Sequence, residues 1–148
     1  MRVVHDPDGR ARPLATTVDV ADSFVSQTVG LMGQSSLPEA YALVFRFGTD
    51  GPDGFERAVA KLPGAGWPPR RFIHMLFVGV ALDVLWLRDG EVVAVETLRP
   101  WTGYGVARAD TIVELPAGAA ADVAVGDRVA IEDDPDDETE APAAAADG

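Results

Sequence analysis

The stretch 71–97 constrains the fold more than any other part of the chain. Its dipeptide Asp89-Gly90 separates two runs of Val, Leu, Trp and Ala. Asp-Gly is among the best two-residue hairpin turns, because both central positions need a positive φ. With Arg88 and Glu91 flanking the turn, both faces of the predicted hairpin are apolar. Such a hairpin must be covered on both sides, as in a sandwich or a closed barrel.

The same register predicts which side chains face one another across the hairpin. Leu87 lies opposite Val92, and Asp83 lies opposite Glu96 on the same mostly apolar face. Two opposed carboxylates repel, and loss of water penalises their charged forms. We therefore expect this pair to share a proton or to grip a ligand. The alternatives are that Asp83 caps backbone amides at a bend, or that a bulge shifts the register and turns one acid to solvent.

Shorter segments on either side of the hairpin predict the rest of a mainly β domain. Alternating and β-branched segments predict strands at residues 2–5, 14–20, 42–47, 111–115 and 128–131. Asp19 or Asp22 can cap a short helix over residues 23–29, ended by Gly30, and residues 55–62 are a second helical candidate. One or two short helices and about seven strands predict a compact antiparallel β-sandwich or barrel of jelly-roll type.

The domain is predicted to span residues 1–131, with an irregular insertion inside it and a tail beyond it. Residues 48–70 contain five glycines and four prolines, which is typical of a surface insertion. Residues 132–148 hold eight acids and no Lys or Arg, so they have little to bury. We expect this segment to be a disordered acidic tail.

Composition excludes several classes of chemistry and of partner. The chain has no cysteine, which excludes disulfides, thiolate catalysis and Cys-ligated metal sites. Its net charge is −12, and no basic stripe is present to neutralise phosphates, so nucleic acid is not expected as a partner. Lys61 is the only lysine. An acidic surface nearly without lysine is typical of a halophilic host, with a GC-rich genome as the alternative explanation.

The sequence also predicts where the protein works. No apolar run is long enough to span a membrane, and residues 1–6 lack the apolar core of a signal peptide. We therefore expect a cytoplasmic protein with no membrane partner, either monomeric or a weak homo-oligomer.

An ordered set of short motifs runs through most of the chain: Gly30-Leu31-Met32, Leu82-Asp83, Asp89-Gly90, Pro100, Val113-Glu114-Leu115, Gly118 and Gly126-Asp127. Together they resemble a small prokaryotic family catalogued as domain of unknown function 192 (DUF192), from Ala15 to Ile131. The resemblance implies a compact, mainly β fold of jelly-roll type. It implies no activity, because the family has no established catalytic residues to carry over. Gln27 and Ala81 depart from the family pattern, which commonly has arginine and proline there.

Candidate catalytic groups are three acids and one histidine. Asp83 and His74 together are suited to acid–base chemistry, with Glu96 or Glu114 in support. Glu114 alternates with apolar neighbours, so facing solvent is the ordinary alternative for it. A metal site would need His74 with these same acids, since His5 alone cannot complete a ligand set. Neither a metal nor a cofactor is expected.

Aromatic side chains and arginines gather in the predicted loops. Trp67 lies in the insertion beside Arg70 and Arg71, and the loop 99–105 carries two more aromatics. Aromatic side chains with arginine on loops over a rigid sheet can bind sugars, anions or peptides. The alternative is that each ring covers an edge or end of the core.

These observations favour a non-catalytic module that binds a small molecule or a protein partner. The predicted ligand-binding residues are Trp101, Tyr104, His74, Asp83 and Arg99. One alternative is an enzyme that uses the Asp83 carboxylate and the His74 imidazole. The other is a structural or accessory protein whose acidic tail docks elsewhere.

Overall fold

The computed structural model describes residues 1–21, 35–47, 63, 68, 70–75 and 78–134. All regular structure in these residues is β-strand: β1 (Arg2–Asp6), β2 (Arg12–Ala15), β3 (Thr17–Ala21), β4 (Tyr41–Arg46), β5 (Arg70–His74), β6 (Leu82–Arg88), β7 (Glu91–Leu98), β8 (Tyr104–Arg108), β9 (Thr111–Pro116) and β10 (Arg128–Glu132). The prediction of a mainly β domain is confirmed. The two helices expected at 23–29 and 55–62, most of the insertion predicted at 48–70 and the tail beyond 134 lie outside the described residues. The last residue of the predicted insertion, Arg70, begins β5.

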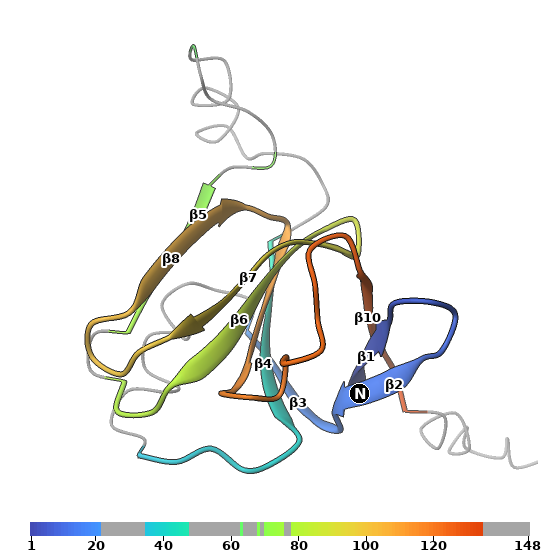
Figure 1. Ribbon diagram of the computed structural model, residues 1–148, viewed down its shortest axis with the longest axis horizontal. Coiled ribbons are helices and arrows are strands. Elements are labelled where there is room, and N and C mark those ends of the chain that lie inside the picture. The colour runs from blue at the N-terminus through green and yellow to red at the C-terminus, as the bar shows by residue number, and fades with distance from the viewer. Residues whose placement is uncertain (22–34, 48–62, 64–67, 69, 76–77, 135–148) are drawn as a thin grey trace, which may run out of the picture.

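The strands form one large sheet and one small sheet (Figure 1). The large sheet has the order β2-β1-β10-β7-β6-β9-β4-β3, and the small sheet pairs β5 with β8. The large sheet does not close into a barrel, since its order has two ends, β2 and β3, in the described residues.

One pair departs from the predicted antiparallel arrangement. β3 and β4 pair in parallel, with Thr17 opposite Tyr41 and Ala21 opposite Phe45. Parallel neighbours need a crossover connection of a dozen or more residues, and the segment 22–40 is long enough to supply it. The expected single strand 14–20 is instead split at Thr16, whose N–H donates to the carbonyl of Ala40 at 2.9 Å.

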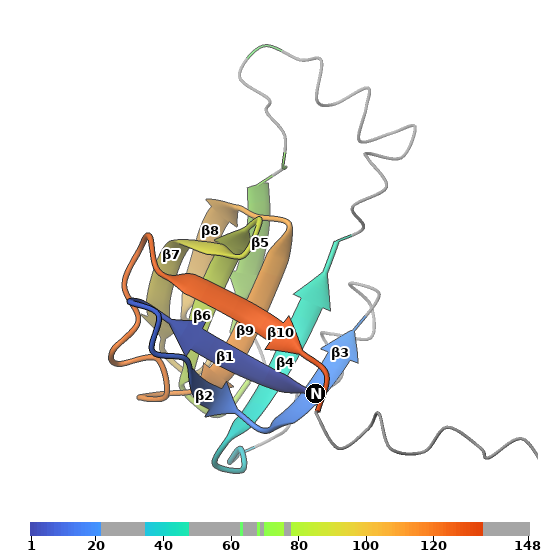
Figure 2. The same ribbon diagram turned by 90° about the vertical axis from the view of Figure 1, so that its right-hand side faces the viewer.

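The large sheet is apolar on both faces around β6, as the hairpin pattern predicted. Every residue of β6 from Leu82 to Leu87 is buried. One face packs Leu85 and Leu87 against a part of the sheet that curls over, formed by β1, β2 and β10 (Figure 2). The other face carries the buried Trp86 and is covered by the small sheet. Burial of both faces makes β6 a main source of hydrophobic stabilisation, whereas most residues of β7 are half-buried or exposed.

The small sheet packs closely on the Trp86 face. Ile73 and Met75 point from the β5 side into the same cluster as Trp86. Gly105 on β8 lies directly against the Trp86 ring, so that a Cβ there would overlap the ring atoms. The inner side of β8 is therefore made of small residues, and its outer side is left facing solvent.

Candidate functional site

The central hairpin has the predicted turn but a different register away from it. Leu87 pairs with Val92 as expected, and a β-bulge follows between Trp86 and Leu87. Beyond the bulge, Asp83 pairs with Thr97 and Val84 pairs with Glu96. The predicted Asp83–Glu96 pair is therefore wrong, because one extra residue on β7 reverses the faces of everything beyond it.

Asp83 is a structural cap. Its Oδ1 accepts a hydrogen bond from the Thr97 hydroxyl at 2.7 Å, and its Oδ2 accepts from the backbone N–H groups of Gly118 and Ala120, both at 2.9 Å. The side chain is only 4% exposed. The carboxylate therefore ties the turn after β9 to β6. Both alternatives to a functional pair occur here: a bulge shifts the register of the hairpin, and Asp83 caps backbone amides.

Asp83 and His74 lie on opposite faces of the large sheet. Asp83 alternates with Leu85, which belongs to the cluster beneath β1, β2 and β10. His74 is on β5, in the small sheet that covers the other face, where it pairs with Tyr104. The His74 Nδ1 is buried without a hydrogen-bond partner in the described residues. Asp83 instead accepts hydrogen bonds from the turn after β9. The structure does not bring the two predicted acid–base partners together.

The other two candidate acids share one row of the sheet. Val84 pairs with Glu96 on one side and with Glu114 on the other, so both acids lie on the Trp86 face. Glu96 is exposed, whereas Glu114 is 7% exposed. Glu114 is thus not the solvent-facing residue that alternation allowed.

Burial changes the acid–base properties of the groups around Glu114. Desolvation raises the pKa of Glu114 to about 7. Within the described part of the chain it has no hydrogen-bond partner. The nearby Tyr41 donates a hydrogen bond to Asp19 Oδ2 at 2.9 Å. Burial, that hydrogen bond and the charges of Asp19 and Glu114 raise the pKa of Tyr41 to about 12.

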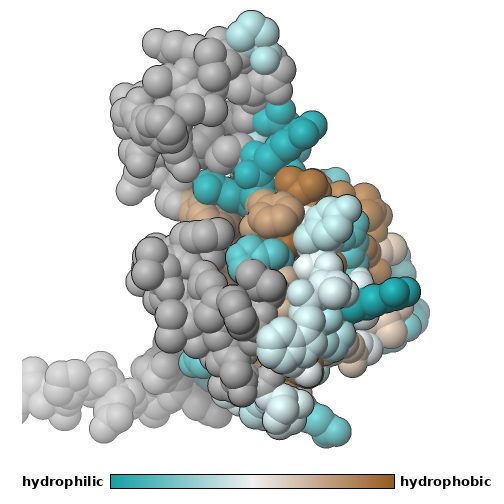
Figure 3. Space-filling view, turned by 90° about the vertical axis from the view of Figure 1, so that its left-hand side faces the viewer, coloured by the Kyte–Doolittle hydropathy of each residue, from teal (hydrophilic) through white to brown (hydrophobic). Residues whose placement is uncertain are grey.

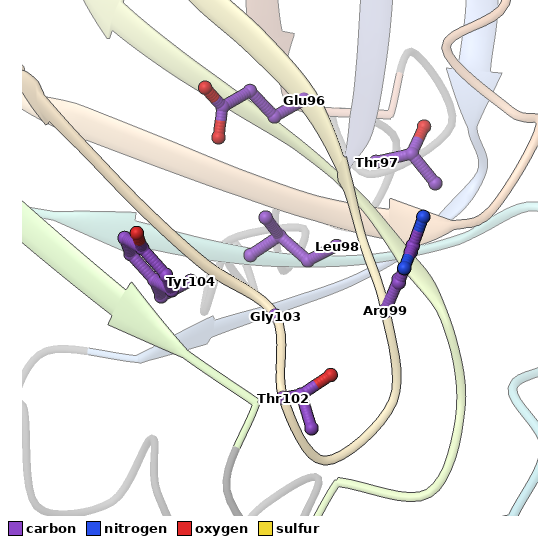
Figure 4. Close-up of a pocket in the computed structure, with 7 residues that line it drawn as sticks. All are labelled: Glu96, Thr97, Leu98, Arg99, Thr102, Gly103 and Tyr104. Carbon is purple, nitrogen blue, oxygen red and sulfur yellow. The ribbon is translucent and has the colours of Figure 1, made fainter.

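An open pocket lies between β7, β8 and the loop that joins them. It has a volume of about 480 Å³ and is lined by Glu96, Thr97, Leu98, Arg99, Thr102, Gly103 and Tyr104. Glu96 and Leu98 project to the side on which the Tyr104 ring lies, whereas Thr97 and Arg99 project to the other side (Figure 4). The predicted ligand-binding residues Tyr104 and Arg99 both line this pocket, and the supporting acid Glu96 lines it with them.

Trp101, in the same loop, has an unusual backbone conformation. Its φ is 64°, in the left-handed region that bulky residues rarely adopt. Its N–H donates to the Val78 carbonyl at 3.0 Å, and the Gly103 N–H donates to the Arg99 carbonyl at 3.0 Å. These bonds hold the loop closed, and the Trp101 side chain remains 55% exposed. Conformations of this kind persist where the surrounding structure enforces them, often at functional sites.

The outer face of the small sheet continues the aromatic surface away from this loop. Strand alternation places six side chains on it in three facing pairs: Arg70 with Arg108, Phe72 with Val106, and His74 with Tyr104. The ring centroids of Phe72 and Tyr104 are 6.2 Å apart, and those of Phe72 and His74 are 6.1 Å apart. On this side of the molecule, hydrophobic surface lies directly beside strongly hydrophilic surface (Figure 3).

Sequence reasoning missed Phe72 and Val106, because it treated residues 99–105 as a loop and did not predict β8. The signal was the alternation of Tyr104, Val106 and Arg108 with small residues. Trp67 lies outside the described residues.

A buried histidine on the opposite side of the molecule was also missed. His5, fully buried, lies 2.7 Å from Asp127 Oδ2 through its Nε2. The Ala124 N–H and the His5 ring both donate to this carboxylate and lower the pKa of Asp127. The contact ties β1 to the turn before β10, which is a structural role.

The described residues contain no group of three or more His, Asp or Glu side chains placed to hold a metal ion. They also include no helix with the length and apolar character needed to cross a membrane.

Comparison with known proteins confirms the resemblance over part of the chain. Residues 67–131 match the model of DUF192, described as "Uncharacterized ACR". No curated protein matches the chain.

Two crystal structures have a similar fold. One, described as a candidate transcription regulator from Sinorhizobium meliloti 1021, is 23% identical with a TM-score of 0.66, over 87% of this chain and 91% of that chain. The other, a protein of unknown function from Novosphingobium aromaticivorans DSM 12444, is 18% identical with a TM-score of 0.65, over 88% of this chain and 84% of that chain. At these identities the likeness establishes the fold alone.

Proposed function

We propose that this chain, whose residues 67–131 match DUF192, is a binding module for a small molecule. The binding surface would be the aromatic corner, which we define as Phe72, His74, Trp101 and Tyr104 with the pocket between β7 and β8. The observation that carries the proposal is the gathering of exposed aromatic side chains at this one place.

The exposed apolar residues of the described chain are concentrated there. Six large hydrophobic side chains are exposed in the described residues. Three of them, Phe72, Trp101 and Tyr104, belong to this corner, and a fourth, Val106, faces Phe72 beside it. Their exposed fractions run from 48% to 68%. Single exposed apolar residues are ordinary, but a contiguous patch typically marks a binding surface. The packing of Gly105 on Trp86 gives this patch a rigid base.

The pocket beside the patch supplies polar groups for specificity. Leu98 is buried and forms apolar lining, while Glu96, Thr102 and Tyr104 bring a carboxylate and two hydroxyls to its walls. Apolar lining with a few placed polar groups is the usual composition of a small-molecule site. Arg99, predicted as a ligand contact, lines the same pocket.

The two alternatives to a binding module have less support. An enzyme built on Asp83 and His74 would need a free carboxylate near the imidazole, and Asp83 instead accepts three hydrogen bonds on the other face of the sheet. The described start of the acidic segment pairs within this chain, Glu132 with Arg2 and Asp134 with the N-terminal ammonium group.

The proposal is tested by titrating the ¹⁵N-labelled protein with a panel of metabolites and following backbone amide shifts. We expect shifts concentrated at residues 70–74 and 98–106, and at least a tenfold loss of affinity in Tyr104→Ala. Val125→Ala removes an exposed apolar side chain outside the corner and is the matched control. Binding that maps elsewhere, binding that Tyr104→Ala leaves unchanged, or a panel without any hit would refute the proposal.

A further inference from the structure

We infer that the ligand of the aromatic corner is a flat heterocycle that carries a phosphate, as in a nucleoside monophosphate, and that Arg70 holds the phosphate. The inference rests on the proposed function and names the class of ligand. It comes from the order of the three side-chain pairs on the outer face of the small sheet.

The first pair places two cations directly opposite each other. Arg70 faces Arg108 across the β5–β8 ladder. Arg108 donates a hydrogen bond to the Pro68 carbonyl at 3.4 Å. Directly opposed like charges destabilise a strand pair, and an anion bound to Arg70 would reduce that penalty. The chain as a whole has 24 acids and 12 bases, so two facing arginines are not a consequence of its composition. Arg70 is exposed and forms no ion pair with the described residues.

The next two pairs provide a surface for a ring. Phe72 and Tyr104 lie diagonally, with centroids 6.2 Å apart and ring planes inclined by 32°. Both are exposed and apolar, so a planar heterocycle can cover them and bury area on each. Phe72 directly adjoins the cationic pair, because it follows Arg70 on the same face of β5.

The spacing fits a ring joined to a phosphate by a short linker. Successive pairs on one face of a strand are about 7 Å apart. A ring seated over Phe72 and Tyr104 therefore has its phosphate within reach of the Arg70 guanidinium. Guanidinium groups bind phosphate with charge-assisted, often bidentate hydrogen bonds.

The Glu96 carboxylate lies on the inner side of β8. A Cβ on Gly105 would point toward the Trp86 ring, and the same Cβ would lie 2.8 Å from Glu96 Oε2. The charged pair on the outer face itself is therefore Arg70 and Arg108.

The test uses three probes that separate the ring from the phosphate. Adenosine 5′-monophosphate carries both, adenosine carries only the ring, and ribose 5-phosphate carries only the anion. By isothermal titration calorimetry, we expect the monophosphate to bind more tightly than either of the other two. Arg70→Gln should weaken monophosphate binding about 10- to 100-fold, the usual contribution of hydrogen bonds to a charged group, and leave adenosine binding unchanged.

Arg88→Gln is the matched control, because Arg88 is an exposed arginine at the hairpin turn, away from the outer face. This variant should bind both adenosine 5′-monophosphate and adenosine with the affinity of the wild type. Equal affinities for adenosine and its monophosphate, an Arg70→Gln variant with unchanged monophosphate affinity, or no binding of the monophosphate each overturn the inference. The proposed function survives those results if the metabolite panel still yields a ligand whose shifts map to the corner, and it fails with them if the panel yields none.

Discussion

At the scale of single residues, Glu114 makes the stability of the fold depend on pH. Its pKa is raised from 4.5 to about 7 by burial, so the folded state binds the proton more tightly than the unfolded state. The stability this provides is complete below pH 4.5 and is lost as the pH rises through 7. The shift corresponds to a loss of roughly 2–3 kcal/mol between pH 5 and pH 8.

Glu114→Gln removes this titration and should flatten the pH dependence of stability by that amount. Urea unfolding at pH 5 and pH 8 measures it for the wild type and the variant. Glu91→Gln, at an exposed position on β7, is the control and should retain the full dependence. Identical pH dependence in wild type and Glu114→Gln would show that Glu114 is ionised in the fold.

Asp83 shows how a residue with a catalytic appearance in the sequence serves the fold. Asp83→Ala leaves the Gly118 and Ala120 N–H groups without their acceptor, and the Thr97 hydroxyl with them. We expect a loss of about 2–4 kcal/mol in the free energy of unfolding, since charged acceptors are worth more than neutral ones. Thr97→Val removes one of the three bonds and should cost about 1 kcal/mol. An Asp83→Ala protein that is as stable as the wild type but has lost ligand affinity would contradict this structural role and show that Asp83 contributes to ligand binding.

At the scale of elements, the turn of the central hairpin could be predicted and its far end could not. Asp89 and Gly90 have φ values of 50° and 76°, the conformation for which that dipeptide is selected. Pairing near the turn follows from it, as with Leu87 and Val92. The bulge that follows has no signature in a run of Val and Ala, because either register buries apolar side chains.

The small sheet is a second case in which the sequence does not show how strands pack. β8 was not predicted because its inner positions are Gly105 and Ala107, which lack the large apolar side chains of a typical alternating strand. These small residues are required by the Trp86 ring of another strand, and a single sequence does not show which strand lies opposite. The parallel pairing of β3 and β4 has the same cause, since both are short alternating strands whose partners are set by the chain between them.

Gly105→Ala tests the packing of β8 on the core. A methyl group there would overlap the Trp86 ring, so β8 must move outward or the ring must shift. We expect a loss of about 1–3 kcal/mol in the free energy of unfolding, typical of overpacking, together with a change in near-ultraviolet circular dichroism. Gly118→Ala, where no atom lies within 4 Å of the added methyl but φ is +95°, measures the cost of backbone strain alone. A Gly105→Ala variant as stable as wild type would mean that β8 is not packed on Trp86.

At the scale of the whole molecule, the fold class and the family resemblance could be predicted from the sequence, while the proposed binding surface could be predicted only in part. Ordered short motifs and a doubly apolar hairpin are enough to predict a mainly β domain and to recognise the resemblance to DUF192. Arg99, Trp101 and Tyr104 were found as residue types in a predicted loop, and His74 was found in the stretch 71–97. The pocket that Arg99 and Tyr104 line depends on how β7 and β8 approach each other, which no pairing signal in the sequence encodes.

The net charge of −12 leads to a prediction about salt. Carboxylates that repel one another destabilise a compact chain, and counterions screen that repulsion at separations beyond about 10 Å at 0.1 M salt. The thermal unfolding midpoint should therefore rise from dilute buffer to molar KCl.

Truncation after Asp134 separates the tail from the rest of the surface. It removes five acids and leaves a net charge of −7. If repulsion among the remaining residues drives the effect, the truncated protein keeps most of the rise in midpoint; if the tail drives it, the rise largely disappears. A midpoint that stays constant across the whole KCl range in the full chain would remove the halophilic interpretation, and the scarcity of lysine would then reflect a GC-rich genome.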